Sequence, residues 1–492
     1  MSKLLRGMAA LLLAALVIPL HAELADAGPA ACEKRNNNTA KKLLECVTLQ
    51  GVREHQAAFQ AIADAHGGNR FSGLPGYDAS VDYVVERLEA AGYDPTVQEF
   101  DYLAFTPLGD SALEQTAPVA TTYVEGVDFG VIDQSDPGDV TAAVTGVDLQ
   151  LVLGNTSTSG CEAADFAGFP AGNIALLQRG TCTFELKAEN AAAAGAVGIV
   201  IFNQGDTADP GRQGIPAVTL TANNTSGIPV LGTTYPLGEE LAGTPGLVMR
   251  VFANTLREIK TTFNVLAETS HGDDSNVVMV GAHLDSVSAG PGINDNGSGS
   301  GAILEVAEQM KKVKPTNTVR FAWWGAEESG LVGSDFYVAN LTDAERANIA
   351  LYLNFDMVGS PNFVRFIYDG DGSAFGLAGP DGSAAIEAGF EDFYADRGLA
   401  FEPTQIDFRS DYAAFFENDI AFGGLFTGAE GIKTAAQRDI YGGIIGEQYD
   451  PCYHEACDTF ANNSNEVLDL NSDAIAFATL TYAMDTSSVD GG

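Results

Sequence analysis

The pattern of hydrophobic and polar positions divides the chain into three stretches. Apolar residues recur at helical spacing over residues 47–67 and 79–92, and a strand pattern follows at residues 93–103. Residues 111–257 are poor in Lys and Arg and carry short β-like runs separated by Gly and Thr. From residue 258 onward, strand patterns alternate with helical patterns. We therefore expect an α/β domain that is interrupted by a β-rich insertion.

The last stretch predicts most of one sheet. We expect strands at residues 263–268, 276–284, 318–325, 351–358, 364–368 and 420–427, and helices at residues 299–313, 331–340, 381–396, 410–418 and 466–485. Strands that alternate with helices form largely parallel sheets. The expected fold class is therefore α/β, a mostly parallel mixed sheet with helices on both faces. The expected domains are residues 23–110 and 258–486 for the α/β unit and residues 111–257 for the insertion.

The N-terminus has the order of a signal peptide. A basic start, MSKLLRG, precedes a 13-residue apolar run that ends in LHA at residues 20–22. The run is too short to cross a bilayer. We expect residues 1–22 to be removed and the protein to be secreted to the periplasm or the medium. Whether residues 23–45 are a removable propeptide stays open.

The charge and the cysteine content limit the possible binding partners of the protein and indicate its cellular compartment. A net charge of −41, from 25 basic and 66 acidic residues, argues against nucleic acid and anionic membranes as partners. Six Cys in an exported chain predict three disulfides, for which fifteen connectivities are possible. We predict pairing between neighbours in the sequence, Cys32–Cys46, Cys161–Cys182 and Cys452–Cys457. We expect a monomer.

Acidic and His-containing motifs follow four of the expected strands. The stretch Val277–Asp295 reads as a buried strand that delivers His283 and Asp285 on one face, followed by a loop that carries Asp295. The other three motifs follow strands 318–325, 351–358 and 420–427 and contain Glu327, Glu328, Asp356 and His454. Sites in open α/β sheets form at the carboxyl ends of the strands. We therefore expect these motifs to meet at one edge.

The residue types at that edge suit a pair of metal ions. Two imidazoles and three carboxylates match two zinc ions, with one His and one terminal carboxylate on each ion and the third carboxylate between them; the candidate ligands are His283, Asp295, Glu328, Asp356 and His454. Paired metals activate a shared water as hydroxide and polarise a carbonyl group, which predicts hydrolysis. Asp285 can orient the imidazole of His283. Because Glu327 and Glu328 are adjacent, one can bind metal while the other transfers protons.

Five motifs resemble those of the bacterial secreted dizinc leucine aminopeptidase family in peptidase clan MH. They are HLDS, GINDNGSGSGAILEVA, WWGAEESGLVGS, NFDMVGS and PCYHEACDT, and the resemblance covers residues 258–486 and, more loosely, 41–110. It implies a zinc-exopeptidase fold and two zinc ions per chain, with peptide or protein N-termini as substrates. It also implies the site roles: His283 and Asp356 on one zinc, Glu328 and His454 on the other, Asp295 as bridge, Glu327 as general base, Asp285 as support of His283, Tyr453 as oxyanion stabiliser and Arg409 as a substrate contact.

Part of the insertion resembles the protease-associated domain. The stretch NIALLQRGTCTFELKAENAAAAGAVGIVIFNQ matches the pattern of that domain at Arg179, Gly180, Cys182, Phe184, Lys187, Asn190, Ala191, Gly195, Ala196 and Gly198. The residue pattern alone would also fit an unrelated β-α-β unit. The resemblance implies a non-catalytic module that shapes the access of substrates.

The function expected from these features is a secreted zinc aminopeptidase that removes the N-terminal residue from peptides and prefers large apolar residues. One alternative is a metallopeptidase of the glutamate carboxypeptidase type, which needs an Arg cluster for the terminal carboxylate of its substrate. A glutaminyl-cyclase-like enzyme would use one zinc, and a catalytically inactive binding module would have lost ligands. The remaining histidines, His55, His66 and His271, are interpreted as surface or helix-end residues.

Overall fold

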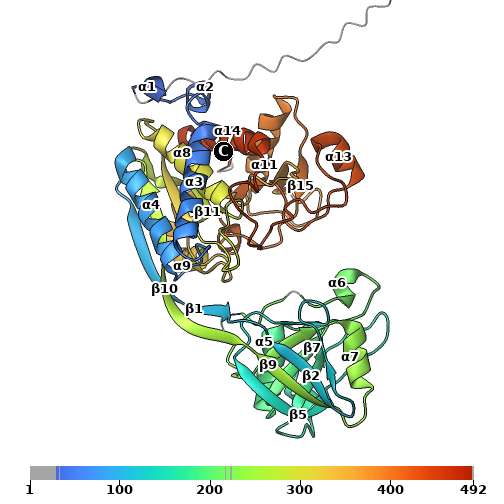
Figure 1. The fold of residues 1–492 in the computed structure, drawn as a ribbon. Helices are drawn as coiled ribbons and strands as arrows, with labels where there is room; N and C mark the ends of the chain where they lie inside the picture. The colour runs from blue at the N-terminus through green and yellow to red at the C-terminus, as the bar shows by residue number, and fades with distance from the viewer. Residues whose placement is uncertain (1–28, 33, 217, 222–223, 490–492) are drawn as a thin grey trace, which may run out of the picture.

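The structure is a computed structural model that describes residues 29–32, 34–216, 218–221 and 224–489. Two bodies are connected by a pair of long strands (Figure 1). Each body is built on its own sheet of eight strands. Within the described residues, no helix is both long and apolar enough to cross a membrane. The predicted signal peptide, residues 1–22, lies outside the described residues.

The larger body is the expected α/β domain with a mixed sheet. Its strands β12, β11, β13 and β16 lie side by side and run parallel. Strands β1 and β10 are antiparallel to their neighbours, and β14 is antiparallel to β16 but parallel to β15. The strand order is β1 (Thr96–Pro107), β10 (Thr255–Glu268), β12 (Asn317–Trp324), β11 (Asp273–His283), β13 (Ile349–Phe355), β16 (Phe422–Phe426), β14 (Phe366–Tyr368) and β15 (Glu402–Thr404).

Successive side chains of the central strands point to opposite faces of this sheet, and each face packs into its own hydrophobic core. Val278 and Val280 belong to one core, whereas Val277 and Met279 belong to the other. The first face is covered by α2 (Ala40–Leu44), α3 (Leu49–Ala65), α4 (Pro75–Ala91), α8 (Gly297–Met310), α11 (Ser383–Ala395) and α14 (Asn465–Met484), and the second by α9 (Val332–Ala339) and α12 (Tyr412–Phe416). The other helices of this body are α1 (Pro29–Cys32), α10 (Asp343–Ala347) and α13 (Ala435–Tyr441).

The smaller body is formed by the insertion. Its strand order is β3 (Thr121–Thr122), β2 (Ala112–Ala117), β9 (Val248–Ala253), β5 (Gly138–Gly146), β6 (Ile174–Gln178), β7 (Gly198–Phe202), β8 (Val230–Thr233) and β4 (Phe129–Val131). Its helices are η1 (Ala163–Phe166), α5 (Phe184–Ala193), α6 (Pro210–Gln213) and α7 (Tyr235–Ala242). The β-α-β unit expected around residues 173–204 is present as β6, α5 and β7. The division at residues 111 and 257 stays our proposal.

The connection between the two bodies is a two-stranded ribbon. Strands β1 and β10 pair without a bulge from Thr96 opposite Leu266 to Pro107 opposite Thr255, and Figure 1 shows β1 and β10 running from one body to the other. We predicted this strand only from residue 263 onward, so its first half was missed. Residues 255–262 are largely polar, and the buried apolar cluster at this level of the ribbon is formed by β1 residues such as Phe100 and Tyr102, so this part of β10 carries no apolar alternation that the sequence could reveal.

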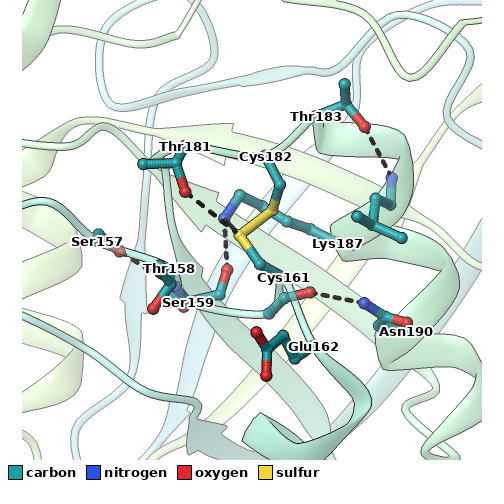
Figure 2. Close-up of a disulfide and its surroundings, with 12 residues drawn as sticks. Ser157, Thr158, Ser159, Cys161, Glu162, Thr181, Cys182, Thr183, Lys187 and Asn190 are labelled. Atoms are coloured by element: carbon teal, nitrogen blue, oxygen red, sulfur yellow. Dashed lines mark hydrogen bonds between the residues drawn. A yellow bond between two sulfur atoms is a disulfide. The ribbon is translucent and has the colours of Figure 1, made fainter.

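A buried lysine ties α5 to the disulfide Cys161–Cys182 (Figure 2). The ammonium group of Lys187 donates to the carbonyl oxygen of Ser159, and the Asn190 amide donates to the carbonyl oxygen of Gly160 at 3.0 Å. Burial lowers the pKa of Lys187 to about 8. The motif residues of the protease-associated pattern therefore hold the loop that precedes β6 against its crossover helix.

All three predicted disulfides are present: Cys32–Cys46, Cys161–Cys182 and Cys452–Cys457. The interpretation of His55 as a surface or helix-end residue was wrong, because its side chain is fully buried between α3, α4 and α8. The His55 Nδ1 atom contacts the Tyr83 hydroxyl at 2.8 Å, and its Nε2 atom lies 3.9 Å from Glu305 Oε2. Burial lowers the pKa of His55 to about 3, so this imidazole is neutral.

The carboxyl group of Glu305 should make folding stability depend on pH. Burial, followed by the charge of Glu308, raises its pKa to about 8 from an ordinary value of 4.5. Between those pH values the unfolded chain releases a proton that the folded chain keeps, so this group favours unfolding increasingly as pH rises toward 8. We expect Glu305→Gln to raise the melting temperature by a few degrees at pH 8.5 and by much less at pH 5. Thermal unfolding at both pH values measures this, with Glu89→Gln on the exposed side of α4 as the control. An equal shift at both pH values would contradict it.

Candidate metal centre and active-site cleft

The five predicted metal ligands meet at the carboxyl edge of the parallel strands. Strand β11 ends at His283 and is followed by the loop that carries Asp295. Glu328 follows β12, and Asp356 comes directly after β13. His454 lies beyond β16 in the short loop closed by the disulfide Cys452–Cys457. Segments that are far apart in the sequence therefore place their side chains in one site.

The distances divide the ligands into two sets that share one carboxylate. The His283 Nε2 atom lies 3.2 Å from Asp356 Oδ1 and 3.2 Å from Asp295 Oδ1. The His454 Nε2 atom lies 3.0 Å from Glu328 Oε2 and 3.3 Å from Asp295 Oδ2. Each oxygen of Asp295 thus faces a different imidazole, which is the geometry that a carboxylate needs to bridge two metal ions.

The electrostatics of the site also fit bound cations. The side chains of Asp295, Glu327 and Glu328 are buried, and Glu328 Oε1 has no hydrogen-bond partner among the described residues. Burial, followed by the charges of Asp356 and Glu328, raises the pKa of Glu327 well above its ordinary value, although His283 opposes the shift. Uncompensated buried charges are costly. Two divalent cations would supply the missing positive charge, so the donor set and its burial fit a two-metal centre.

Asp285 connects the ligand His283 to the loop that carries Glu327. The Nδ1 atom of His283 lies 3.1 Å from the backbone carbonyl oxygen of Asp285 and 3.7 Å from its carboxylate Oδ1. The same Oδ1 atom accepts the backbone N–H of Glu327 at 3.2 Å. The nearer partner of the imidazole is therefore the backbone carbonyl, and the carboxylate also positions the residue predicted as general base.

Asp458 links the two ligand loops to each other. Its carboxylate accepts the backbone N–H groups of Asn294 at 2.8 Å and Asp295 at 2.9 Å. Because Asp458 directly follows Cys457, the disulfide loop that presents His454 also fixes the backbone beside Asp295. Burial, followed by the charge of Asp450, raises the pKa of Asp458 to about 8, against the two N–H donors.

Three further buried residues support the site. Arg70 is fully buried and donates to the carbonyl oxygens of Leu284, Pro291 at 2.9 Å and Gly292 at 2.7 Å, which shapes the loop before Asp295. The Ser410 hydroxyl donates to Asp356 Oδ2 at 2.7 Å. Asp411 is fully buried beside the site, and burial raises its pKa to about 8.

Sequence reasoning missed these supporting residues. Arg70 stands alone between two helices, and Asp458 and Asp411 look like ordinary polar neighbours of other motifs. A buried strand or a ligand spacing marks the predicted metal ligands, but no such local signal marks a residue whose partner is about 160 or more positions away, as for Asp458 and Arg70. Residues 407–412, DFRSDY, contain both Ser410 and Asp411, but we predicted a role only for Arg409 among them.

Tyr453 and Arg409 lie together at the edge of the site. The Tyr453 ring stacks on the His454 imidazole, with ring centroids 3.8 Å apart, and its hydroxyl oxygen accepts from Arg409 Nη2 at 3.1 Å. Arg409 is half-exposed and also donates to Glu430 Oε1 at 2.7 Å. The backbone of His454 has a φ of 59°, which turns its side chain out of the disulfide loop toward Asp295 and Glu328.

The site opens into a cleft of about 720 Å³ between the two bodies. The α/β body contributes the predicted metal ligands Asp295, Glu328, Asp356 and His454 together with Glu327, Arg409 and Tyr453. It also contributes an apolar wall of Phe71, Phe105, Val287, Met357, Tyr368, Phe408 and Phe426. The insertion contributes Asp133, Gln134 and Thr219. The cleft can therefore take an apolar group beside a reactive centre, with the insertion as its opposite wall.

The contacts of Asp458 lead to a prediction about metal binding. In Asp458→Asn, one of the two backbone N–H groups beside Asp295 should lose its acceptor, which would loosen the ligand that both metal sites share. We expect metal affinity to fall about 10- to 100-fold, the usual cost of losing such a support. Competition with a chelator measures the affinity, and circular dichroism checks the fold. Glu455→Gln, an exposed change in the same disulfide loop, should leave the affinity unchanged. Equal affinities in both variants would show that Asp458 does not support the centre.

Comparison with known proteins agrees with this site. The sequence profile of peptidase family M28 matches residues 264–479, and that of the PA domain matches residues 147–241. The chain is 55% identical over 453 residues to an aminopeptidase of Pseudomonas aeruginosa, covering 92% of this chain and 84% of that protein. It is 40% identical over 451 residues to leucine aminopeptidase 2 of Trichophyton equinum, and this alignment covers 90% of this chain and 86% of that protein.

A solved structure is similar over nearly the whole length of both chains. The aminopeptidase from Aneurinibacillus sp. strain AM-1 superposes with a TM-score of 0.70 at 25% identity, covering 89% of this chain and 95% of that one. The family resemblance predicted from the five motifs is thus confirmed. The chain belongs to peptidase family M28, as an aminopeptidase with an inserted PA domain.

Proposed function

We propose that the protein is a secreted dizinc aminopeptidase that removes the N-terminal residue from peptides and prefers large apolar residues. The observation that carries the proposal is Asp295, whose two carboxylate oxygens lie 3.2 and 3.3 Å from the imidazoles of His283 and His454. Imidazole and carboxylate donors in this number suit zinc. The three disulfides are consistent with export to an oxidising compartment.

Each group at the centre would have a defined task. His283 and Asp356 would hold one zinc ion, Glu328 and His454 the other, and Asp295 both. Bound zinc supplies a Lewis acid that polarises the scissile carbonyl and acidifies water. Glu327 would take the proton from the attacking water and deliver it to the leaving nitrogen, because it is buried beside the ligands and its Oε2 atom lies 3.9 Å from His283 Nε2.

Tyr453 and the apolar wall would position the substrate. The Tyr453 hydroxyl lies beside the ligand His454 and faces the cleft, where it can donate to the oxyanion that forms at the carbonyl carbon. The apolar side chains of Met357, Tyr368 and Phe426 would receive the side chain of the N-terminal residue. The buried carboxylates near the metals would attract the free α-ammonium group.

The alternatives fit the cleft less well. A carboxypeptidase needs several guanidinium groups for the terminal carboxylate. Of the described residues that line the cleft, Arg409 alone is an arginine, and Glu430 already neutralises it at 2.7 Å. A single-zinc enzyme would not need the second set, Glu328 and His454. A binding module without activity would have no use for Glu327.

A matched pair of substrates tests the proposal. We expect the protein to hydrolyse leucine p-nitroanilide and to leave its N-acetylated form intact. We also expect slower hydrolysis of the glutamate and lysine p-nitroanilides, because an apolar wall receives the side chain. Removing zinc should abolish activity, and adding zinc should restore it with two ions per chain. Hydrolysis of neither compound by protein that holds two zinc ions would refute the aminopeptidase mechanism.

Replacing the general base tests the role of Glu327. Glu327→Gln should lower kcat about 10²- to 10⁴-fold, the contribution typical of a positioned proton-transfer group. Because Glu327 is not one of the proposed ligands, the zinc content should stay at two ions per chain. Steady-state kinetics and metal analysis measure both quantities, and Glu455→Gln serves as the control. A loss of zinc together with the activity would instead assign Glu327 to the metal ligands.

A further inference from the structure

The insertion places a carboxylate without a close ion-pair partner among the described residues in the active-site cleft. Asp133 lies in the loop between β4 and β5 and lines the same cleft as Glu328 and His454. Its side chain is exposed to the cleft, and its carboxylate makes no hydrogen bond or close ion pair with any residue that the structure describes. Burial in the cleft raises the pKa of this carboxyl group, against the charge of His454. This carboxylate is therefore available to a bound substrate.

The loop that carries Asp133 is held firmly at its base. Its neighbour Gln134 is buried and has a φ of 63°, a left-handed conformation that costs about 1 kcal/mol or more for a residue other than glycine. The Asp133 carbonyl oxygen accepts the N–H of Leu220 at 2.9 Å. The Ser135 hydroxyl oxygen accepts the N–H of Val230 at 2.8 Å. The backbone carbonyl oxygen of Ser135 accepts from Thr255 Oγ1 at 3.0 Å.

A buried arginine on the connecting ribbon completes this anchor. Arg257 on β10 donates to Asp136 Oδ1 at 2.7 Å and to Gln134 Oε1 at 3.4 Å. The residues after Asp133 are thus bound to the strand that leads to the catalytic body. A fixed backbone holds the charge of Asp133 over the cleft, so binding a cation there requires little ordering of the loop.

The other charges of the cleft are already engaged. The carboxylates at the centre belong to the proposed zinc ligands and the general base. Arg409 is paired with Glu430, and Asp407, which accepts from the Tyr412 hydroxyl at 2.9 Å, lies on the α/β body within the electrostatic reach of Arg409. Asp133 is therefore left as a charged group of the wall that a substrate can pair with.

The position of Asp133 indicates which part of a peptide it meets. The apolar side chains that suit an N-terminal residue, such as Met357, Tyr368 and Phe426, belong to the α/β body. Asp133 belongs to the opposite wall, formed by the insertion. With the N-terminal side chain against the apolar wall, the next residue of the peptide would lie toward the insertion.

We propose that Asp133 is a specificity-determining residue that favours peptides with Lys or Arg directly after the N-terminal residue and disfavours Asp or Glu there. The inference rests on the proposed aminopeptidase function and deepens it by naming a substrate class. A carboxylate attracts an ammonium or guanidinium group and repels a second carboxylate, and a single partly solvated pair of this kind changes affinity by about tenfold or less.

Three peptides that differ only at their second residue test the inference. We would measure kcat/KM for release of leucine from Leu-Lys-Ala, Leu-Gln-Ala and Leu-Glu-Ala with the full-length, zinc-loaded protein. The wild type should prefer them in that order. Asp133→Asn should reduce the ratio between the Lys and Glu peptides by about tenfold, and Asp133→Lys should invert the preference. Glu239→Gln removes the same charge from α7 on the PA domain, outside the cleft lining, and should leave the ratio unchanged.

The outcomes separate this inference from the proposed function. Release of leucine with the same ratio in the wild type and both Asp133 variants would overturn the role of Asp133 and leave the aminopeptidase function intact. A change that appears only between lysine and leucine p-nitroanilide would place Asp133 at the N-terminal residue instead and also overturn it. If the wild type releases leucine from none of the peptides, the proposed function fails, and the inference fails with it.

Discussion

The structure depends on gathering several carboxylates and two imidazoles in one largely buried place. Asp295, Glu327 and Glu328 are kept from water, and their mutual repulsion would favour proton uptake or opening of the site. Bound dications offset this repulsion only if the ligands already stand at the right separations. The surrounding hydrogen bonds therefore serve mainly to hold like charges at fixed positions.

This explains why the supports of the site are built from backbone hydrogen bonds. Arg70 binds carbonyl oxygens of the loop before Asp295, and Asp458 binds N–H groups at Asn294 and Asp295 itself. Both residues act on the main chain, so the side chain of Asp295 remains free to face His283 and His454. The parallel strands bring the loops to one edge. The buried Arg and Asp then fix the conformation of each loop.

The fold was predictable, and the proposed metal ligands could be placed at one edge of the sheet, because both leave local patterns. Apolar runs of the correct length predicted the central strands, and His283, Glu328 and Asp356 each stand directly at or after such a run. Residues that act across the fold left no such pattern. Arg70 contacts a loop more than 200 positions away, and His55 is buried because three helices converge on it. The polar half of β10 was missed since the apolar side chains at that level of the ribbon come from β1 and not from β10.

The ribbon also ties the shape of the active-site cleft to the position of the PA domain. Phe105 on β1 and Arg257 on β10 are register partners, but their side chains contribute to different parts of the molecule. Phe105 lines the cleft, whereas Arg257 holds Gln134 and Asp136 beside the carboxylate of Asp133. A slip of either strand by one residue would turn its side chain to the opposite face of the ribbon. The unbroken pairing from Thr96 to Pro107 therefore positions the second wall of the cleft as well as joining two domains.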